Sequence, residues 1–284
     1  MHWPFAKYVG CGNDFILFDN RQQQFPYDQA DLIIQLCDRH QGIGADGIIL
    51  LELSKVADCR LRIFNADGSE AEMCGNGARC FVKWLKTLGF SQSSFRIETM
   101  HRVLQAHLIE DQVQIKMGSP SAIQWNIPFS FEDESFQVHY LDTGVPHVLM
   151  FVEEIDDLDL NTLGPYVRYH SLWAPKGTNL TLVEQMSGSH LKIRTYERGV
   201  EGETLACGTG ATAAALGMAH QRHLKGPLTV ETRSGEHLVI DFNSHEETFS
   251  SVTMTGPARC VFQGRIELAA TVTVDSHLTY SVIF

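Results

Sequence analysis

The chain contains one sequence pattern twice. The segment at residues 60–79 (RLRIFNADGSEAEMCGNGAR) resembles the segment at residues 190–212 (HLKIRTYERGVEGETLACGTGAT). Their central cysteines, Cys74 and Cys207, are 133 positions apart. The same offset relates GADGIILLE to GTNLTLVE and RIET to TVET. Because a pattern repeated in the same order is typical of a duplicated structural unit, we predict two similar units of about 120 residues each.

Each copy has the pattern of strands, then a glycine-rich turn, then a helix. Polar and apolar residues alternate at residues 60–64 and 190–196, which is the two-residue period of half-buried strands. Apolar residues at helical spacing follow at residues 75–89, and an alanine-rich segment that favours a helix follows at residues 208–223. Both predicted helices begin directly after a cysteine. The mixture of strands and helices predicts an α/β (α+β) fold class.

A proline-containing acidic segment separates the two copies. Residues 119–136 carry Pro120, Pro128 and a cluster of acidic residues, which is typical of a connection between domains. We therefore predict an N-terminal domain at residues 1–118, a C-terminal domain at residues 119–262, and a strand at residues 263–284 that returns to the first domain.

The balance of charges narrows the choice of partners. The chain has 22 Lys plus Arg against 34 Asp plus Glu, a formal net charge of −12, and no run of basic residues. Nucleic acids and anionic membrane surfaces are bound by clustered Lys and Arg, so neither partner is expected. No apolar run reaches the roughly 18 residues of a membrane-spanning helix, and the first residues lack the pattern of a secretion signal. We expect a cytoplasmic protein that acts on a small molecule.

The cysteine pattern argues against disulfides and against a structural metal. Seven cysteines, an odd number, are spread through the chain without a C-x-x-C pair. That pattern differs from a secreted disulfide framework, so reduced thiols are expected. Cys74 and Cys80, which are close in sequence, have no nearby His-x-x-x-His to complete a zinc site, and no metal is expected.

Cys74 and Cys207 are candidates for acid/base chemistry. A cysteine at the first turn of a helix faces unpaired backbone N–H groups and the positive end of the helix dipole, which stabilise its thiolate. The flanking glycines allow backbone amides to approach a ligand and form a pocket for a carboxylate; they are Gly75, Gly77, Gly208 and Gly210. If one thiolate removes the α-proton of an amino acid and the opposite thiol returns a proton to the other face, the carbon is inverted.

The cysteines and glycines also allow other interpretations. An isolated cysteine is usually a small buried hydrophobe, and we assign that role to Cys37, Cys59, Cys80 and Cys260. The matched glycine-rich flanks disfavour that role for the two repeat cysteines. A redox pair of those two thiols, as in a sensor or thiol oxidoreductase, is disfavoured by the missing C-x-x-C. Nucleotide binding is disfavoured because neither G-x-x-x-x-G-K-[ST] nor a complete G-x-G-x-x-G is present.

The motifs taken together resemble the diaminopimelate epimerase family. The resemblance begins at FAKYVGCGNDF, continues through GIGADG, FNADGSEAEMCGNGARC, PKGTNLTLVE and TYERGVEGETLACGTGA, and ends with GPARCVFQGRI. It implies two pseudo-symmetric domains, each a curved, mainly antiparallel sheet around a central helix. It also implies an enzyme of lysine and peptidoglycan precursor synthesis that interconverts LL- and meso-2,6-diaminopimelate without pyridoxal phosphate, metal or nicotinamide. Cys74 and Cys207 would be its two acid/base residues.

The same resemblance implies roles for polar residues around the thiols. Residues that would bind the distal amino acid centre are Asn13, Asn65, Asn179, Glu197 and Arg198. Backbone groups that would hold the reacting carboxylate belong to Gly75, Asn76, Gly208 and Thr209. Glu197 and His147 would tune the cysteines or the substrate's ammonium group.

Two positions depart from residues common in the family. Val145 stands where an Asn or Thr commonly precedes the Pro-His dipeptide, and Gly47 stands where some members have Gln. The departure at Val145 favours tolerance of other amino acids, and the one at Gly47 removes another possible contact to the substrate. Alternatives therefore stay open: a racemase of another amino acid, of the glutamate or proline type, or a noncatalytic amino acid binding protein. A homodimer is a further possibility.

Overall fold

The computed structural model describes residues 2–132, 134–272 and 278–283, and it divides into two compact units. The first unit comprises Met1–Ile115 and Pro257–Phe284, and the second comprises Lys116–Gly256. The boundaries predicted from sequence, at residues 118 and 262, lie a few residues downstream of these.

The first unit is built on one sheet and two helices. Its strands are β1 (His2–Gly10), β2 (Asn13–Asp19), β3 (Gly47–Glu52), β4 (Cys59–Asn65), β5 (Glu70–Ala71), β6 (Ser94–Glu98), β7 (Val103–Ile109), β8 (Gln112–Lys116), β18 (Arg259–Val272) and β19 (Leu278–Ile283). Its helices are α1 (Ala30–Cys37) and α2 (Gly75–Thr87). Strands pair in the order β19-β18-β1-β2-β3-β4-β6-β7-β8, with β5 also beside β4.

The second unit repeats this plan. Its strands are β9 (Ser121–Phe131), β10 (Glu134–Asp142), β11 (Pro146–Val152), β12 (Asn179–Ser187), β13 (His190–Glu197), β14 (Gly202–Thr204), β15 (Leu228–Glu231), β16 (His237–His245) and β17 (Thr248–Gly256). Its helices are α3 (Leu160–Arg168), α4 (Gly208–Arg222) and the 3-10 turns η1 (Ile155–Asp157) and η2 (Ser171–Trp173). Strands pair in the order β9-β10-β11-β12-β13-β15-β16-β17, with β14 beside β13.

The strand pairings follow the same pattern in the two units. Two neighbouring pairs in each unit are parallel, β2 with β3 and β4 with β6 in the first, β11 with β12 and β13 with β15 in the second. Each parallel pair needs a crossover, and each crossover contains a helix. The other pairings described above are antiparallel, so the predicted mixed fold with mainly antiparallel sheets is confirmed.

Strands β9 and β18 occupy matching positions in the two units. The chain enters the second unit as β9, which pairs with β10, and returns to the first as β18, which pairs with β1 in the matching position. The segment at residues 119–136, predicted to be a connection, therefore lies largely in β9 and β10. Pro128 is tolerated within β9 because β10 is its partner strand among the described residues, which leaves one side of β9 without a ladder to interrupt.

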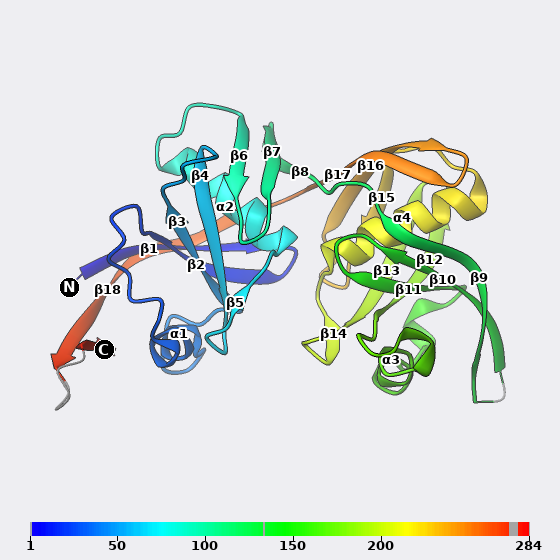
Figure 1. Ribbon diagram of the computed structural model, residues 1–284, viewed down its shortest axis with the longest axis horizontal. Coiled ribbons are helices and arrows are strands. Elements are labelled where there is room, and N and C mark those ends of the chain that lie inside the picture. Colours follow the sequence, from blue (N-terminus) through cyan, green and yellow to red (C-terminus); the bar gives the residue numbers. More distant parts are fainter. Residues whose placement is uncertain (1, 133, 273–277, 284) are drawn as a thin grey trace. The chain divides into compact units, whose positions relative to one another are not determined.

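A helix lies against each face of the central strands (Figure 1). In the first unit, alternate residues of β3 point in opposite directions: Ile49 approaches Gly77 of α2, whereas Ile48 packs in a core cluster with Ile33 and Leu36 of α1. In the second unit, Leu149 of β11 approaches Gly217 of α4, whereas Val148 packs in a cluster with Leu163 of α3. Two covered faces explain why these strands read as continuous apolar runs.

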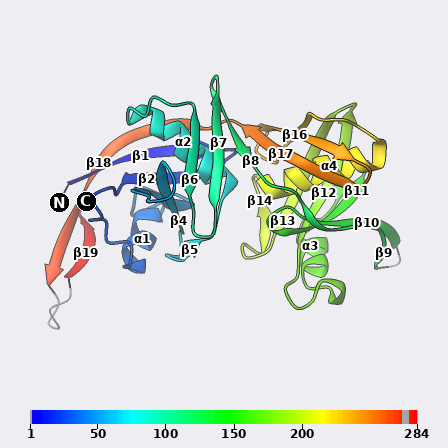
Figure 2. The same ribbon diagram turned by 45° about the horizontal axis from the view of Figure 1, so that its top comes forward.

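The alanine-rich helix α4 is enclosed on all sides. Every residue from Gly210 to Ala219 is buried, and α4 contacts β10–β13 and β15–β17. Small side chains permit this, because they allow strands to approach the helix closely. Figure 2 shows α4 among the strands of its own unit and α2 among those of the other. This matches the predicted central helix in each copy.

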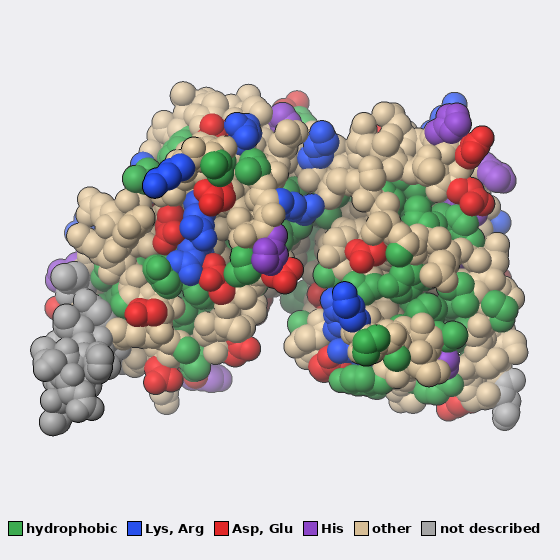
Figure 3. Space-filling view, viewed as in Figure 1, with side chains coloured by type: hydrophobic (Ala, Val, Ile, Leu, Met, Phe, Trp, Pro, Cys, Tyr) green, Lys and Arg blue, Asp and Glu red, His purple; other side chains and the backbone are tan. Residues whose placement is uncertain are grey.

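Charges are mixed on the face of the molecule that Figure 3 displays, where Lys and Arg side chains are interspersed with Asp and Glu. Within the described residues, no helix combines the length and the apolar character needed to span a bilayer.

Candidate active site

Each of the two repeat cysteines caps the central helix of its unit. Cys74 is the N-cap of α2 and Cys207 is the N-cap of α4, and both have extended backbone conformations. Cys74 Sγ accepts a hydrogen bond from the backbone N–H of Gly77 at 3.4 Å, and Cys207 Sγ accepts one from Gly210 at 3.4 Å. The prediction that both helices begin directly after a cysteine is confirmed. Each sulfur thus lies at a helix end that presents backbone donors.

Two asparagines surround Cys74 in the first unit. Asn13 Oδ1 lies 3.5 Å from Cys74 Sγ, which donates to it, and 3.4 Å from Asn76 Nδ2. Asn13 begins β2 and Asn76 lies in the first turn of α2, so the hairpin between β1 and β2 brings Asn13 to the helix end. Of the residues predicted for this unit, the structure therefore brings together Asn13, Cys74, Gly75 and Asn76.

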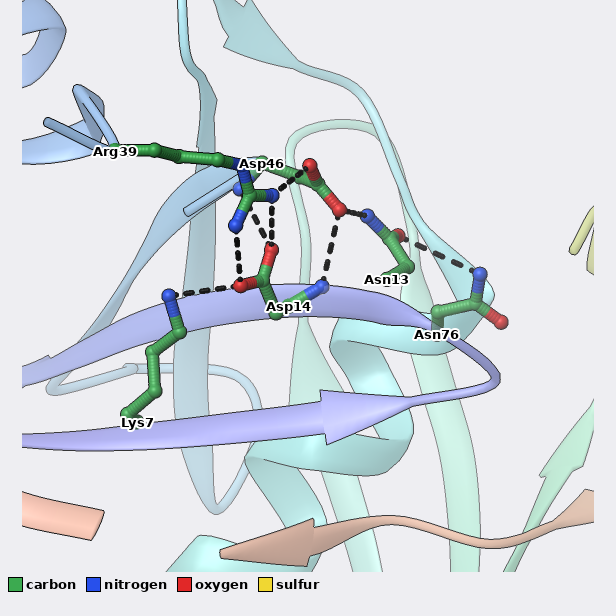
Figure 4. Close-up of polar contacts among 6 residues, drawn as sticks. All are labelled: Lys7, Asn13, Asp14, Arg39, Asp46 and Asn76. Atoms are coloured by element: carbon green, nitrogen blue, oxygen red, sulfur yellow. Dashed lines mark hydrogen bonds and ion pairs between the residues drawn. The ribbon is translucent and has the colours of Figure 1, made fainter. Parts of the chain in front are cut away.

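A network of charged groups holds the Asn13 amide in one orientation (Figure 4). Asn13 Nδ2 donates to Asp46 Oδ2 at 2.7 Å, and a carboxylate can only accept there. The amide oxygen must then point toward Cys74. Asp46 and Asp14 accept backbone N–H bonds from each other, and Arg39 donates to both carboxylates.

The Asp14 carboxylate is the most strongly held member of this network. Lys7 Nζ lies 2.8 Å from it, and Lys7 is itself buried. Burial raises the pKa of Asp14, but the hydrogen bonds and charges of Arg39 and Lys7 together lower it by more. The resulting pKa lies well below its ordinary value. Asp14 therefore stays ionised across the physiological range, and the network around Asn13 keeps its charges.

A fully buried arginine supports Asn76 from the other side. Arg79 donates to Asn76 Oδ1 at 2.8 Å, to Cys11 Sγ at 3.2 Å and to the carbonyl of Pro257 at 3.2 Å. Arg79 lies one helical turn after Asn76 in the C-G-N-G-A-R motif. It thereby links the start of α2 to the β1–β2 hairpin and to the beginning of the returning strand.

Cys207 of the second unit lies in a different environment. Its Sγ is 3.3 Å from Thr209 Oγ1 and 4.0 Å from His147 Nε2, and its thiol is hydrogen-bonded to Glu197. Burial raises the pKa of the Cys207 thiol well above its ordinary value, the negative charge of Glu197 raises it further, and hydrogen bonds from Thr209 and Gly210 lower it by less. At Cys207, burial and the neighbouring carboxylate outweigh the stabilisation of the thiolate by the helix donors.

His147 is held neutral inside the second unit. It is fully buried on β11, with Nδ1 2.9 Å from Thr181 Oγ1 and Nε2 2.9 Å from Thr209 Oγ1. Burial lowers the pKa of His147 to about 3, and the charge of Arg198 contributes in the same direction. Because it is neutral at pH 7, His147 orients Thr209 rather than supplying a positive charge to the sulfur.

Glu197 joins the end of β13 to Cys207. Its carboxylate accepts a short hydrogen bond from Thr204 Oγ1 and a second from the Cys207 thiol. Burial raises the pKa of Glu197, and these two hydrogen bonds lower it by less. The carboxyl group is thus closer to exchanging a proton near neutral pH than an exposed glutamate.

Asn179 connects the histidine to the loop after β13. Its Nδ2 lies 3.3 Å from His147 Nε2, and its Oδ1 accepts the backbone N–H of Arg198 at 2.7 Å. The Arg198 guanidinium donates to the carbonyl of Lys176 at 3.3 Å. The structure therefore brings together the residues predicted for this unit: His147, Asn179, Glu197, Arg198, Cys207, Gly208 and Thr209.

Asn65 lies at the end of β4 and is exposed, with its amide donating to Ser69 Oγ at 3.0 Å. Among the described residues, Asn65 has no hydrogen bond to the Cys74 group, unlike Asn13.

Gly77 and Gly210, the third residues of α2 and α4, allow these helices to pack closely against the strands. A Cβ at Gly210 would lie 3.0 Å from the hydroxyls of Thr181 and Thr195, and one at Gly77 would lie 3.2 Å from Ile49 Cδ1. These glycines allow the helix ends to approach the strands, so the expectation that they exist to admit a ligand is only part of their explanation.

The remaining cysteines differ in burial. Cys37, Cys59 and Cys80 are buried, and burial raises the pKa of each thiol, to about 12 for Cys37 and Cys59. The structure supports their assignment as small hydrophobes. The same assignment is wrong for Cys260, which is exposed because residues 259–263 of β18 are exposed on both faces of the strand.

Comparison with known proteins decides the family. The family model for diaminopimelate epimerase matches residues 5–123 and 139–261. The chain belongs to the diaminopimelate epimerase family. A diaminopimelate epimerase of Aquifex aeolicus is 38% identical over 278 residues, covering 92% of this chain and 97% of that protein. One of Chlorobaculum tepidum is 40% identical over 263 residues, covering 91% and 99%. The family predicted from the sequence motifs is thereby confirmed.

Solved structures show that the fold extends beyond the family. A phenazine biosynthesis protein of the PhzF family from Bacillus anthracis superposes with a TM-score of 0.73 at 16% identity, covering 94% of this chain and 99% of that chain. A hydroxyproline epimerase from Agrobacterium vitis superposes with a TM-score of 0.63 at 13% identity, covering 93% and 92%. At this low identity the comparison concerns the fold alone.

Several residues of the two clusters were missed by sequence analysis. They are Lys7, Asp14, Arg39, Asp46 and Arg79 in the first unit and Thr143, Thr181, Thr195 and Thr204 in the second. Thr181 had a usable signal, because it stands between two apolar residues, Leu180 and Leu182, and shares the face of Asn179 two residues before it. Arg39 had none, since nothing in the sequence links it to Asp14.

Proposed function

We propose that this protein is an isomerase that interconverts LL- and meso-2,6-diaminopimelate, in lysine and peptidoglycan precursor synthesis. The observation that carries the proposal is the pair of N-cap cysteines at matching positions of a duplicated fold, in a chain that belongs to the diaminopimelate epimerase family. Inversion at a carbon requires one group that removes a proton and another that delivers one to the opposite face. The chain supplies one thiol in each unit for these two tasks.

The protonation of Cys207 suggests how the tasks are divided. Its raised pKa favours the thiol, so in one direction of the reaction Cys207 delivers the proton and Cys74 removes one. In the reverse direction Cys207 must lose its proton. Glu197, whose pKa is raised and which interacts with the thiol, would accept that proton, so that the thiolate forms beside a neutral carboxyl group.

The polar residues would recognise an amino acid zwitterion. Backbone N–H groups at Gly75, Asn76, Gly208 and Thr209 occupy the first turns of α2 and α4, where unpaired donors suit the reacting carboxylate. Asn65, Asn179, Glu197 and Arg198 would read the distal amino acid centre by directed hydrogen bonds. Asn13, which the family resemblance assigns to the distal centre, contacts Cys74 and would instead act near the reacting carbon. His147 would hold Thr209 in place.

Solvent deuterium exchange tests the reaction. Purified protein in heavy water, without added cofactor, is expected to place deuterium at the α-carbon of diaminopimelate isomers and to leave glutamate and proline unlabelled. No exchange with any substrate would indicate a binding protein, and faster exchange of glutamate or proline would indicate a different racemase. The Cys260→Ala variant is the control, since its thiol lies on the exposed part of β18 and should leave exchange unchanged.

We further propose that the enzyme works in the cytoplasm and can form a homodimer. The cytoplasmic setting is supported by the odd number of cysteines, spread through the chain without a C-x-x-C pair, which is unlike a secreted disulfide framework. Exposed apolar side chains on β18, Val261 and Phe262, support association of two copies. Analytical ultracentrifugation of the native chain and of the Phe262→Asp variant tests the dimer, and an unchanged monomer in both would contradict it.

A further inference from the structure

Three side chains that commonly bind metals meet on the outer face of the second unit's sheet. They are His190 at the start of β13, Glu231 at the end of β15 and His237 at the start of β16. Glu231 pairs directly with His237 across the antiparallel ladder, and His190 lies diagonal to Glu231 across the parallel one. Their neighbours in the strands, Leu191 and Leu238 among them, are buried. Strand alternation therefore turns all three polar side chains to the same, outer face.

Their ligand atoms are almost at coordinating distance. Glu231 Oε2 lies 3.9 Å from His190 Nε2 and 3.8 Å from His237 Nε2, and one ligand atom of each residue lies within 4.8 Å of the others. Ligands of a tetrahedral zinc ion, with bonds of about 2.0–2.2 Å, stand roughly 3.3–3.5 Å from one another. The side chains of His190, Glu231 and His237 are 37%, 31% and 48% exposed, so small rotations can close the difference.

Their polar atoms are not committed to other groups. Within the part of the chain that the structure describes, His190 Nε2 is buried without a hydrogen-bond partner, a state that costs free energy unless a ligand satisfies it. Glu231 has the two histidines as its ion-pair partners among the described residues. Lys192, which stands opposite Glu231 in the ladder, instead donates to Asp156 at 2.5 Å.

The matching position of the first unit shows that this set is not part of the duplicated framework. Glu98 of β6 corresponds to Glu231, because it pairs with Arg60 and Val103 as Glu231 pairs with Lys192 and His237. Val103 thus replaces one histidine. Asp58, two residues before Arg60, replaces the other. Glu98 accepts a hydrogen bond from Ser54 Oγ at 2.6 Å. The imidazoles are specific to the second unit.

We propose that His190, Glu231 and His237 form a binding site for Zn²⁺. Two imidazoles and one carboxylate are a donor set that zinc favours, and it leaves a fourth position for water. Because the ligands come from three neighbouring strands, a bound ion cross-links β13, β15 and β16. The site is separate from the Cys207 cluster: His190 and Glu197 occupy opposite ends of β13, about 23 Å apart for an extended strand.

Calorimetric titration with Zn²⁺ of four forms of the full chain tests the proposal. They are the native chain, the double variant His190→Ala/His237→Ala, Glu231→Gln, and the control His245→Ala, which removes an exposed histidine from the far end of β16. Zinc also binds thiols, but that signal is common to all four. We expect the native chain and the control to show a site that the double variant lacks and that Glu231→Gln binds at least about tenfold more weakly. Equal isotherms for all four would overturn the proposal.

The imidazole nitrogens give a second, residue-specific readout. In long-range ¹H–¹⁵N spectra, Zn²⁺ is expected to shift the Nε2 signals of His190 and His237 and to leave His245 unchanged. Should both rings fail to respond to Zn²⁺, the cluster is an ion pair only and the proposal fails. Circular dichroism and cooperative thermal unfolding of each zinc-free variant establish that it is folded, as expected for substitutions on the outer face.

Discussion

The two thiols cap equivalent helices but have different neighbours. Cys74 lies beside Asn13, whose amide is held by Asp46 in a network of ion pairs. Cys207 lies beside a hydroxyl, a neutral histidine and a carboxyl group. The backbone plan, including the hydrogen bond from the third residue of the helix, is the same in both. The comparison teaches that a duplicated scaffold sets where a thiol stands, whereas side chains from other strands set its protonation.

Removing either thiol is the strongest test of this pairing. Cys74→Ala and Cys207→Ala should each lower kcat for diaminopimelate epimerisation by at least about 10³-fold, because each removes one of the two proton-transfer groups. Steady-state turnover by circular dichroism at the chiral centre measures this. If one variant keeps native turnover while the other is inactive, the two units do not share the chemistry.

Changing the neighbours of each thiol should have effects confined to one unit. Glu197→Gln should lower the pKa of Cys207, since the carboxylate's charge raises it, and leave the labelling of Cys74 unchanged. Asp46→Ala should free the Asn13 amide and lower kcat by about ten- to a hundredfold without changing Cys207. The pH dependence of alkylation of each cysteine, followed by mass spectrometry, distinguishes them.

Asp28→Ala removes an exposed carboxyl group from the same unit and is the matched control for Asp46→Ala. A loss of turnover in the control equal to that in Asp46→Ala would show that the network around Asn13 has no special role.

Buried histidines of the second unit should make its stability depend on pH. An unfolded histidine binds a proton near pH 6.5, whereas His147 binds one near pH 3. Between these values the unfolded chain holds more protons, so the free energy of unfolding falls as the pH is lowered, by up to about 1.4 kcal/mol per pH unit from this group. His139, whose pKa burial lowers to about 4 with a further contribution from His220, acts in the same direction.

Urea unfolding at several pH values between 4 and 7 measures that slope. His147→Gln should flatten it and His139→Gln should flatten it partly. A slope unchanged by His147→Gln would show that this residue is protonated in the folded state as readily as in the unfolded chain.

The two helix glycines should tolerate alanine to different degrees. Gly210→Ala meets two threonine hydroxyls at 3.0 Å, whereas Gly77→Ala meets the flexible end of Ile49 at 3.2 Å. We expect Gly210→Ala to lower the free energy of unfolding by about 1–2 kcal/mol and Gly77→Ala by less. Equal losses would show that the packing of the helix ends is the same in both units.

Much of the secondary structure was predictable because it depends on local sequence patterns. Alternation at residues 60–64 and 190–196 predicted β4 and β13, and the glycine-flanked cysteines predicted the starts of α2 and α4. The segment at residues 119–136 was predicted to be a connection because its prolines are typical of linkers. Only the pairing of β9 with β10 shows that most of it is an edge strand. Arg39, Asp46 and Thr209's bond to His147 were not predictable, since these partners are distant in sequence.

The sequence by itself determined the duplication, the helix starts at Cys74 and Cys207, and the family, because these depend on periodicity and motif. The tertiary structure decided the protonation of Cys207, Glu197 and His147, because burial and approach of charges arise only when separate strands pack together. It also decided that His190, Glu231 and His237 meet. No spacing along the chain predicts that meeting, which follows from the register of three neighbouring strands.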